Sequence, residues 1–85
     1  MVTFTYTITD EVGIHARPAG LLVKEAKSYP ETVTLSCNGK SADAKRLMAL
    51  LALGVRKGDT VTLEISGDNE AETAVKLEEF FEANL

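Results

Sequence analysis

The sequence has one cysteine, two prolines and no tryptophan, and only 6% of its 85 residues are aromatic. A single cysteine, Cys37, rules out an internal disulfide. Its apolar neighbours at alternate positions, Val33 and Leu35, favour a small buried or edge-strand residue over a reactive thiol. One cysteine and one histidine are also too few for a structural zinc centre. We therefore expect a protein of a reducing compartment, the cytoplasm, with no metal and no cofactor.

Long apolar runs and excess positive charge are also missing. No apolar run approaches the roughly 20 residues that cross a bilayer, and Met1–Thr5 has no basic segment followed by an apolar one, so we expect neither a signal peptide nor membrane insertion. Nine Lys and Arg residues face 13 Asp and Glu residues, which gives a net charge of −4. Nucleic-acid binding needs a dense basic face and is therefore disfavoured. Length and a 45% hydrophobic content predict one globular domain, residues 1–85.

Charge is divided unevenly along the chain. Residues 64–85 hold seven acidic residues against one base, Lys76, whereas residues 1–63 hold eight bases against six acids. We interpret the C-terminal stretch as a solvated acidic helix. The bases must then gather elsewhere on the molecule.

Alternation of apolar and polar residues, which is typical of half-buried strands, occurs three times. The three segments are residues 2–8, 32–37 and 60–66. The pair Asn38-Gly39 favours a type I′ hairpin turn, because that turn needs positive φ at both central residues. Residues 40–43 are therefore expected to form a short returning strand.

Helical spacing of apolar residues predicts three helices. The first covers residues 16–27, with Ala19, Leu22, Val23 and Ala26 facing inward, and the second covers residues 44–53 and ends at Gly54. The third follows Asn69, with an inward stripe of Ala71, Ala74, Val75, Glu78, Phe81 and Leu85, widened by Leu77. The order β-α-β-β-α-β-α predicts an α+β two-layer open-faced sandwich, in which the three helices cover one face of a four-stranded antiparallel sheet.

The residues best suited to chemistry lie at the start of the first helix. His15 is the only histidine, and the free amides of Ala16 and Arg17 at a helix N-terminus bind anions. The planar guanidinium of Arg17 suits phosphate oxygens. This combination indicates a nucleophile beside an anion-binding helix end. A lone histidine there is also compatible with an ordinary surface residue or a weak helix cap.

The segment GIHARPA at residues 13–19 resembles the active-site signature of HPr, the histidine-containing phosphocarrier family of the bacterial sugar phosphotransferase system. The resemblance extends over essentially the whole chain, including NGKS at residues 38–41. It implies that His15 accepts a phosphoryl group from phospho-enzyme I, derived from phosphoenolpyruvate, and donates it to enzyme IIA of a sugar permease. Arg17 and the amides of Ala16 and Arg17 would stabilise the group in transit, and the protein would be a carrier rather than an enzyme.

The resemblance also gives a role to the predicted helix 44–53, which is apolar on nearly all sides. An ordinary core explains Leu50 and Leu53, whereas the family implies an exposed patch near His15 that docks enzyme I and enzyme IIA. This patch would contain Leu47, Met48 and Leu51. We add to the docking surface Gly20 and four bases that would steer acidic partners, although each base is also compatible with a solvated helix face: Lys24, Lys27, Lys45 and Arg46.

The chain departs from the family at three positions. Arg46 stands where many Gram-positive members have a serine that a regulatory kinase phosphorylates, so we expect no regulatory serine here. Val12 and Gly20 replace residues near the active site that are often polar or larger. Two alternatives remain open: a carrier of a regulatory, nitrogen-related branch, and a module that binds a regulator without phosphate. We expect a monomer.

Overall fold

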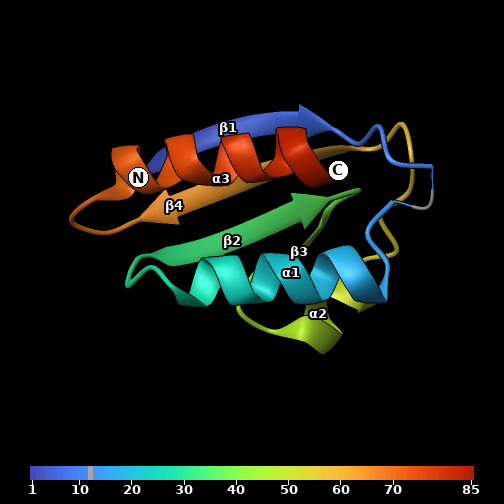
Figure 1. The fold of residues 1–85 in the computed structure, drawn as a ribbon, viewed down its shortest axis with the longest axis horizontal. Coiled ribbons are helices and arrows are strands. Elements are labelled where there is room, and N and C mark those ends of the chain that lie inside the picture. Colours follow the sequence, from blue (N-terminus) through green and yellow to red (C-terminus); the bar gives the residue numbers. More distant parts are fainter. Residues whose placement is uncertain (12) are drawn as a thin grey trace.

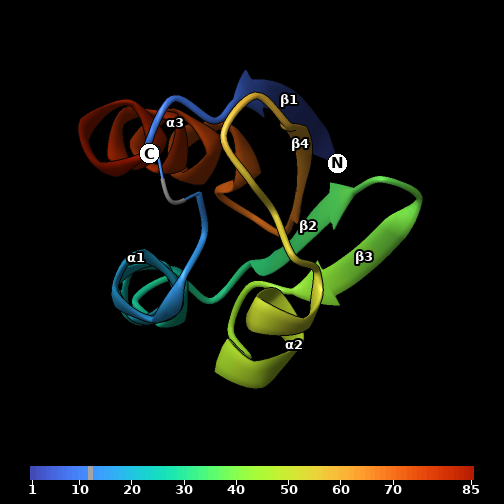
Figure 2. The same cartoon turned by 90° about the vertical axis from the view of Figure 1, so that its right-hand side faces the viewer.

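The computed structural model describes residues 1–11 and 13–85. Its four strands are β1 (Val2–Thr7), β2 (Thr32–Cys37), β3 (Lys40–Asp43) and β4 (Thr60–Ser66). They form one antiparallel sheet in the order β1-β4-β2-β3. The helices α1 (Ala16–Lys27), α2 (Leu47–Ala52) and α3 (Glu70–Asn84) cover one face of this sheet (Figures 1 and 2). The predicted open-faced α+β sandwich is confirmed.

The sheet is apolar on its helix side and polar on its open side. On β4, Val61, Leu63 and Ile65 are buried, whereas Thr62 and Glu64 alternate with them on the other face. β4 pairs with β1 on one side and β2 on the other, so it is an interior strand of the sheet. This alternation is expected of an antiparallel sheet that packs one face on a core and leaves the other to water.

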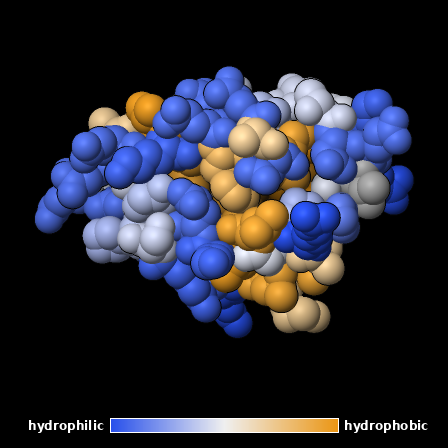
Figure 3. All heavy atoms as spheres, in the orientation of Figure 1, coloured by the Kyte–Doolittle hydropathy of each residue, from blue (hydrophilic) through white to orange (hydrophobic). Residues whose placement is uncertain are grey.

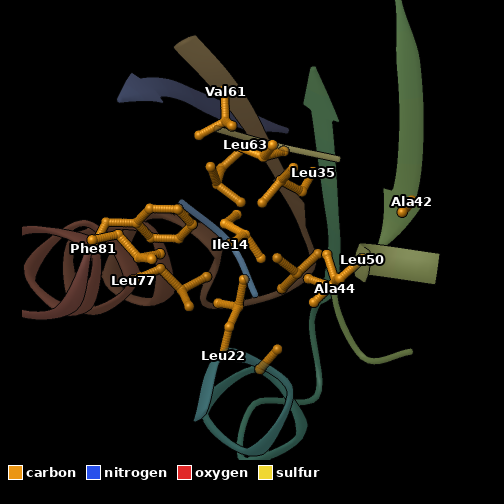
Figure 4. Close-up of a cluster of buried hydrophobic side chains, with 14 of the residues drawn as sticks. Ile14, Leu22, Leu35, Ala42, Ala44, Leu50, Val61, Leu63, Leu77 and Phe81 are labelled. Carbon is orange, nitrogen blue, oxygen red and sulfur yellow. The ribbon is translucent and has the colours of Figure 1, made fainter. Parts of the chain in front are cut away.

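The core lies between the sheet and all three helices. Figure 4 shows side chains of β2 and β4 meeting Leu22 of α1, Leu50 of α2, and Leu77 and Phe81 of α3. The ring of Phe81 packs edge-on against the ring of Tyr6, with centroids 5.6 Å apart. α3 thereby covers the β1 side of the sheet, while α1 and α2 cover the β2 side.

Cys37 is buried in this core, as predicted. Burial raises the pKa of its thiol, and the nearby carboxylate of Asp59 acts in the same direction. The hairpin prediction is also confirmed, because Asn38 and Gly39 have φ values of 53° and 80°. Among the described residues, no helix is long and apolar enough to cross a membrane.

The second helix is shorter than predicted: α2 begins at Leu47 rather than at residue 44. Ala44, the residue after β3, is instead held to β2, since its N–H donates to the carbonyl of Val33 at 2.9 Å. The Asp43 carboxylate then accepts the N–H of Lys45 at 2.9 Å, which closes a turn. Aspartate favours such local turns over helix, and the apolar run alone does not reveal this competition.

The inward face of α3 is also rotated from the predicted stripe. Ala71, Val75 and Glu78 are exposed and Thr73 is buried, whereas four residues are buried as predicted: Ala74, Leu77, Phe81 and Leu85. The buried Glu31 accounts for the shift, because its carboxylate accepts a hydrogen bond from the Thr73 hydroxyl at 2.7 Å. Thr73 is thus buried through its hydrogen bond with Glu31, although hydropathy alone predicts an apolar residue at a buried position of the helix.

Candidate functional site

His15 is the N-cap residue of α1, in extended conformation with φ −113° and ψ −172°. Its carbonyl accepts the N–H of Ala19 at 2.9 Å, but within the described part of the chain its ring makes no capping hydrogen bond. The side chain is partly exposed. A role as a helix cap therefore does not explain this residue, and its ring nitrogens can reach a ligand from solvent.

The loop before His15 is fixed against the segment that follows α2. The N–H of Ile14, a buried residue, donates to the carbonyl of Val55 at 3.1 Å. Gly13 has a φ of +74°, and a Cβ built at this position would lie 2.4 Å from the same carbonyl oxygen. Only glycine allows this close approach. The position of His15 is consequently set by backbone contacts on its N-terminal side.

The first turn of α1 leaves backbone N–H groups without a partner inside the helix. The amides of Ala16 and Arg17 belong to the first turn, where the helix supplies no acceptor, and both residues are exposed. The third residue, Pro18, has no N–H and is buried. No acidic residue lies in this turn. The positive end of the helix dipole and the Arg17 guanidinium thus adjoin the imidazole.

His15 lies in a pocket of about 260 Å³ at one end of the molecule. The lining residues are Asp10, His15, Arg17, Pro18, Leu21, Ala83 and Asn84. Figures 1 and 2 show why residues so far apart in sequence meet there: the start of α1 and the end of α3 lie at the same end of the fold. The carbonyl of Leu85 accepts the N–H groups of Thr9 and Asp10 at 2.7 and 2.8 Å, which joins the end of α3 to the loop.

Asp10, Ala83 and Asn84 were not predicted as site residues. The packing of α3 across the sheet brings these residues together at the pocket. No local sequence pattern predicts such a tertiary contact. Leu21 was also missed, although a signal exists: it falls outside the inward stripe of its helix. A leucine on the outward face of a helix start is a candidate for a binding surface.

Six of the predicted docking residues lie on α1 and α2, namely Gly20, Lys24, Lys27, Leu47, Met48 and Leu51. Met48 is 75% exposed, and Leu47 and Leu21 are 39% and 42% exposed. Leu51 and Gly20 are half-buried. α1 packs against α2, and Figure 3 shows hydrophobic residues on the surface where these two helices lie. A contiguous exposed apolar surface often marks an interaction site, whereas single exposed apolar residues are common on any protein.

The four predicted basic residues differ in how free they are. Lys24 and Lys27 are exposed on α1, and Arg46 is exposed as the N-cap residue of α2. Lys45 is half-buried, and its ammonium group donates to the carbonyl of Tyr29 at 2.9 Å. Lys45 therefore also holds the end of α1 in place. Val12, the other expected departure near the site, lies outside the described residues.

Comparison with known proteins gives a consistent result. Residues 2–83 match the family model described as the PTS HPr component phosphorylation site. The chain is 46% identical over 70 residues to phosphocarrier protein HPr of Vibrio cholerae serotype O1, covering 82% of each chain. It is 37% identical over 76 residues to the HPr of Mycoplasma capricolum subsp. capricolum, which covers 89% of this chain and 84% of the relative.

The solved structures agree at the level of the fold. The crystal structure of HPr-C-His from Thermoanaerobacter tengcongensis superposes with a TM-score of 0.93 at 33% sequence identity. The match covers 99% of this chain and 94% of that chain. The shared fold therefore includes the start of α1 and the end of α3, the elements that form the pocket.

Proposed function

The chain belongs to the HPr family of phosphocarrier proteins, and from that premise we propose that it carries a phosphoryl group on His15 from phospho-enzyme I to enzyme IIA of a sugar permease. The observation that carries the proposal is the placement of His15. Its ring is partly exposed and not used as a helix cap, and it lies beside the exposed first turn of α1. The protein would act in the cytoplasm as an intermediate of a relay, with no turnover of its own.

The chemistry requires little beyond position and charge. In the family the acceptor is Nδ1, which attacks phosphorus as the bond from phosphorus to the donor's nitrogen breaks. The dianionic phosphoryl group is then stabilised by the amides of Ala16 and Arg17 and by the Arg17 guanidinium. Donation to enzyme IIA reverses these steps, with the N–P bond to His15 breaking. A phosphoramidate is reactive enough to be passed on.

Docking would use the exposed apolar surface of α1 and α2 described above. Leu21, Leu47 and Met48 supply apolar contact area, and the flexible thioether of Met48 adapts to more than one partner. Lys24, Lys27 and Arg46 surround this area with positive charge. Two acidic partners could then use the same surface in turn, each bringing its reactive group to the pocket.

The departure at residue 46 bears on regulation. Arg46 supplies no hydroxyl for a kinase, and it occupies the N-cap position of α2. We propose that the chain is not regulated by serine phosphorylation at this site. Incubation with the regulatory kinase and ATP should leave its mass unchanged.

We also propose that the chain acts as a monomer.

The direct test is incubation with enzyme I and phosphoenolpyruvate, followed by intact-mass measurement. The wild-type protein should gain the mass of one phosphate, and acid should remove the label while alkali spares it. His15→Ala should gain nothing. His15 is outside the core, so circular dichroism should show this variant to be folded. A label of the same size in the variant would overturn the assignment of His15.

A further inference from the structure

The pocket that holds His15 is also lined by an acidic residue, Asp10. Among the described residues that line it, Asp10 is the one acidic residue and Arg17 the one with a permanent positive charge. Asp10 also lines an adjoining pocket of about 200 Å³, which includes Glu82 of α3. The surface next to the imidazole is therefore not uniformly positive. Towards α3 it becomes acidic.

The backbone of Asp10 is held in place from both sides. Its N–H donates to the carbonyl of Leu85 at 2.8 Å, and its own carbonyl accepts the N–H of Gly13 at 3.1 Å. The Thr9 hydroxyl donates to the Leu85 carbonyl as well, at 3.0 Å. These bonds fix the Cα of Asp10 at the edge of the pocket. Its charge therefore stays near any anion that the pocket takes up.

We propose that Asp10 weakens the binding of the phosphoryl group at His15 and so keeps phospho-His15 easy to transfer. The inference rests on the proposed function, of which it is a refinement. A carrier has to release what it accepts, and a site built only from cations and amides would hold the dianion too firmly. The carboxylate raises the free energy of the phosphorylated state by repulsion. Arg17 acts in the opposite direction, and the two together set the transfer equilibrium.

The first test needs no partner protein. Inorganic phosphate is titrated into ¹⁵N-labelled wild type and Asp10→Asn, and the amide signals of Ala16 and Arg17 are followed. We expect Asp10→Asn to bind phosphate about 3- to 10-fold more tightly, and the difference to shrink at high salt because salt screens partly exposed charges. Unchanged or weaker binding would overturn the proposal.

Glu72→Gln is the matched control, because it removes the same charge from the exposed first turn of α3 at the opposite end of the molecule (Figure 1). It should leave phosphate binding unchanged. An equal gain in affinity in this control would show that only net charge matters, and would also overturn the proposal.

The second test measures the transfer equilibrium itself. At a fixed ratio of phosphoenolpyruvate to pyruvate with enzyme I present, Asp10→Asn should hold a larger phosphorylated fraction than wild type. A labelled wild type with an unchanged fraction in Asp10→Asn would refute the role of Asp10 and leave the carrier function intact. An unlabelled wild type would refute the carrier function, and the phosphate titration would still decide whether Asp10 opposes the anion.

Discussion

Gly13 and Gly20 both lie within a few residues of His15, but only Gly13 lacks room for a larger side chain. Gly13 adopts a φ of +74°, and an added Cβ would lie 2.4 Å from the Val55 carbonyl oxygen. Gly13→Ala should therefore lower the free energy of unfolding by about 1–3 kcal/mol through backbone strain and overpacking. Urea-induced unfolding measures this change. Phosphorylation by enzyme I should slow as well, because the loop that places His15 is displaced.

Gly20 lies inside α1, and an added Cβ there would meet nothing within 4 Å. Gly20→Ala should raise the free energy of unfolding by about 0.4–1 kcal/mol, because alanine restricts the unfolded chain without strain in the helix. The same substitution thus changes stability in opposite directions at the two positions. Equal losses of stability in both variants would contradict the close packing of Gly13 against the Val55 carbonyl.

Among the secondary-structure elements, α2 combines a buried and an exposed face within six residues. Met48 is 75% exposed, whereas Leu50 is fully buried. Met48→Ala should change stability by less than about 0.5 kcal/mol, yet weaken binding to enzyme I by about 1–2 kcal/mol, or roughly 5- to 30-fold in Kd. Calorimetric titration with enzyme I measures the affinity.

Leu50→Ala provides the contrast within the same helix. It should cost about 2–5 kcal/mol of stability through the lost apolar contacts and the cavity that remains. If Met48→Ala bound enzyme I as tightly as the wild type, the proposal that α2 is part of the docking surface would be wrong.

The buried Glu31 links the turn after α1 to the start of α3. Its carboxylate accepts the Thr73 hydroxyl and the N–H of Asn69, and the Thr73 hydrogen bond is the main cause that holds the pKa of Glu31 below the ordinary 4.5. Because the folded pKa is the lower one, the ionised carboxylate stabilises the protein above about pH 4.5. That contribution is lost as the pH falls through the folded pKa.

Glu31→Gln should therefore be less stable than wild type at pH 7 and should lose less stability between pH 5 and about pH 3. Urea unfolding at several pH values measures both effects. Glu79→Gln, at an exposed position of α3, serves as the control and should keep the wild-type profile. A wild-type slope in Glu31→Gln would refute the role of this link.

The same elements show what local sequence can predict. Residues 32–37 and 60–66 alternate clearly, and those two strands have the predicted bounds because pleat and burial share a period of two. The strand at residues 40–43 followed from the hairpin turn at Asn38-Gly39. The motif around His15 predicted the start of α1 correctly, with Ala16 as its first residue, while anion binding there stays a prediction. The inward face of α3 was predicted only in part, since the burial of Thr73 depends on its contact with Glu31. Asp10 and Asn84 were missed for the same reason: only tertiary packing brings them to the pocket.

Over the whole molecule, charge is separated between two surfaces. α3 carries much of the acidity of residues 64–85, while Lys24, Lys27 and Arg46 are exposed on α1 and at the start of α2. The net charge of −4 would repel the acidic partners of the proposed function on average, so under that proposal the local basic surface orients the encounter. We therefore expect a partner to approach on the α1–α2 side, towards His15.

Arg46→Glu should consequently lower the association rate with enzyme I by about 10-fold at low salt, with little difference at high salt. Stability should not fall, because a carboxylate is favourable at a helix N-terminus. Stopped-flow fluorescence measures the rate. Lys40→Glu makes the same charge change on β3, away from α1 (Figure 2), and should have a much smaller effect. Equal effects of the two variants would point to net charge rather than to a basic docking surface.

In the proposed function, the imidazole at the start of α1 takes up the phosphoryl group and the neighbouring amides hold it. Proton–nitrogen and phosphorus NMR of the protein, before and after treatment with enzyme I and phosphoenolpyruvate, examines both parts at once. We expect phosphorus coupled to a ring nitrogen of His15 and large amide shifts at Ala16 and Arg17. Phosphorus coupled to another residue, or amide shifts confined to a different part of the fold, would contradict it.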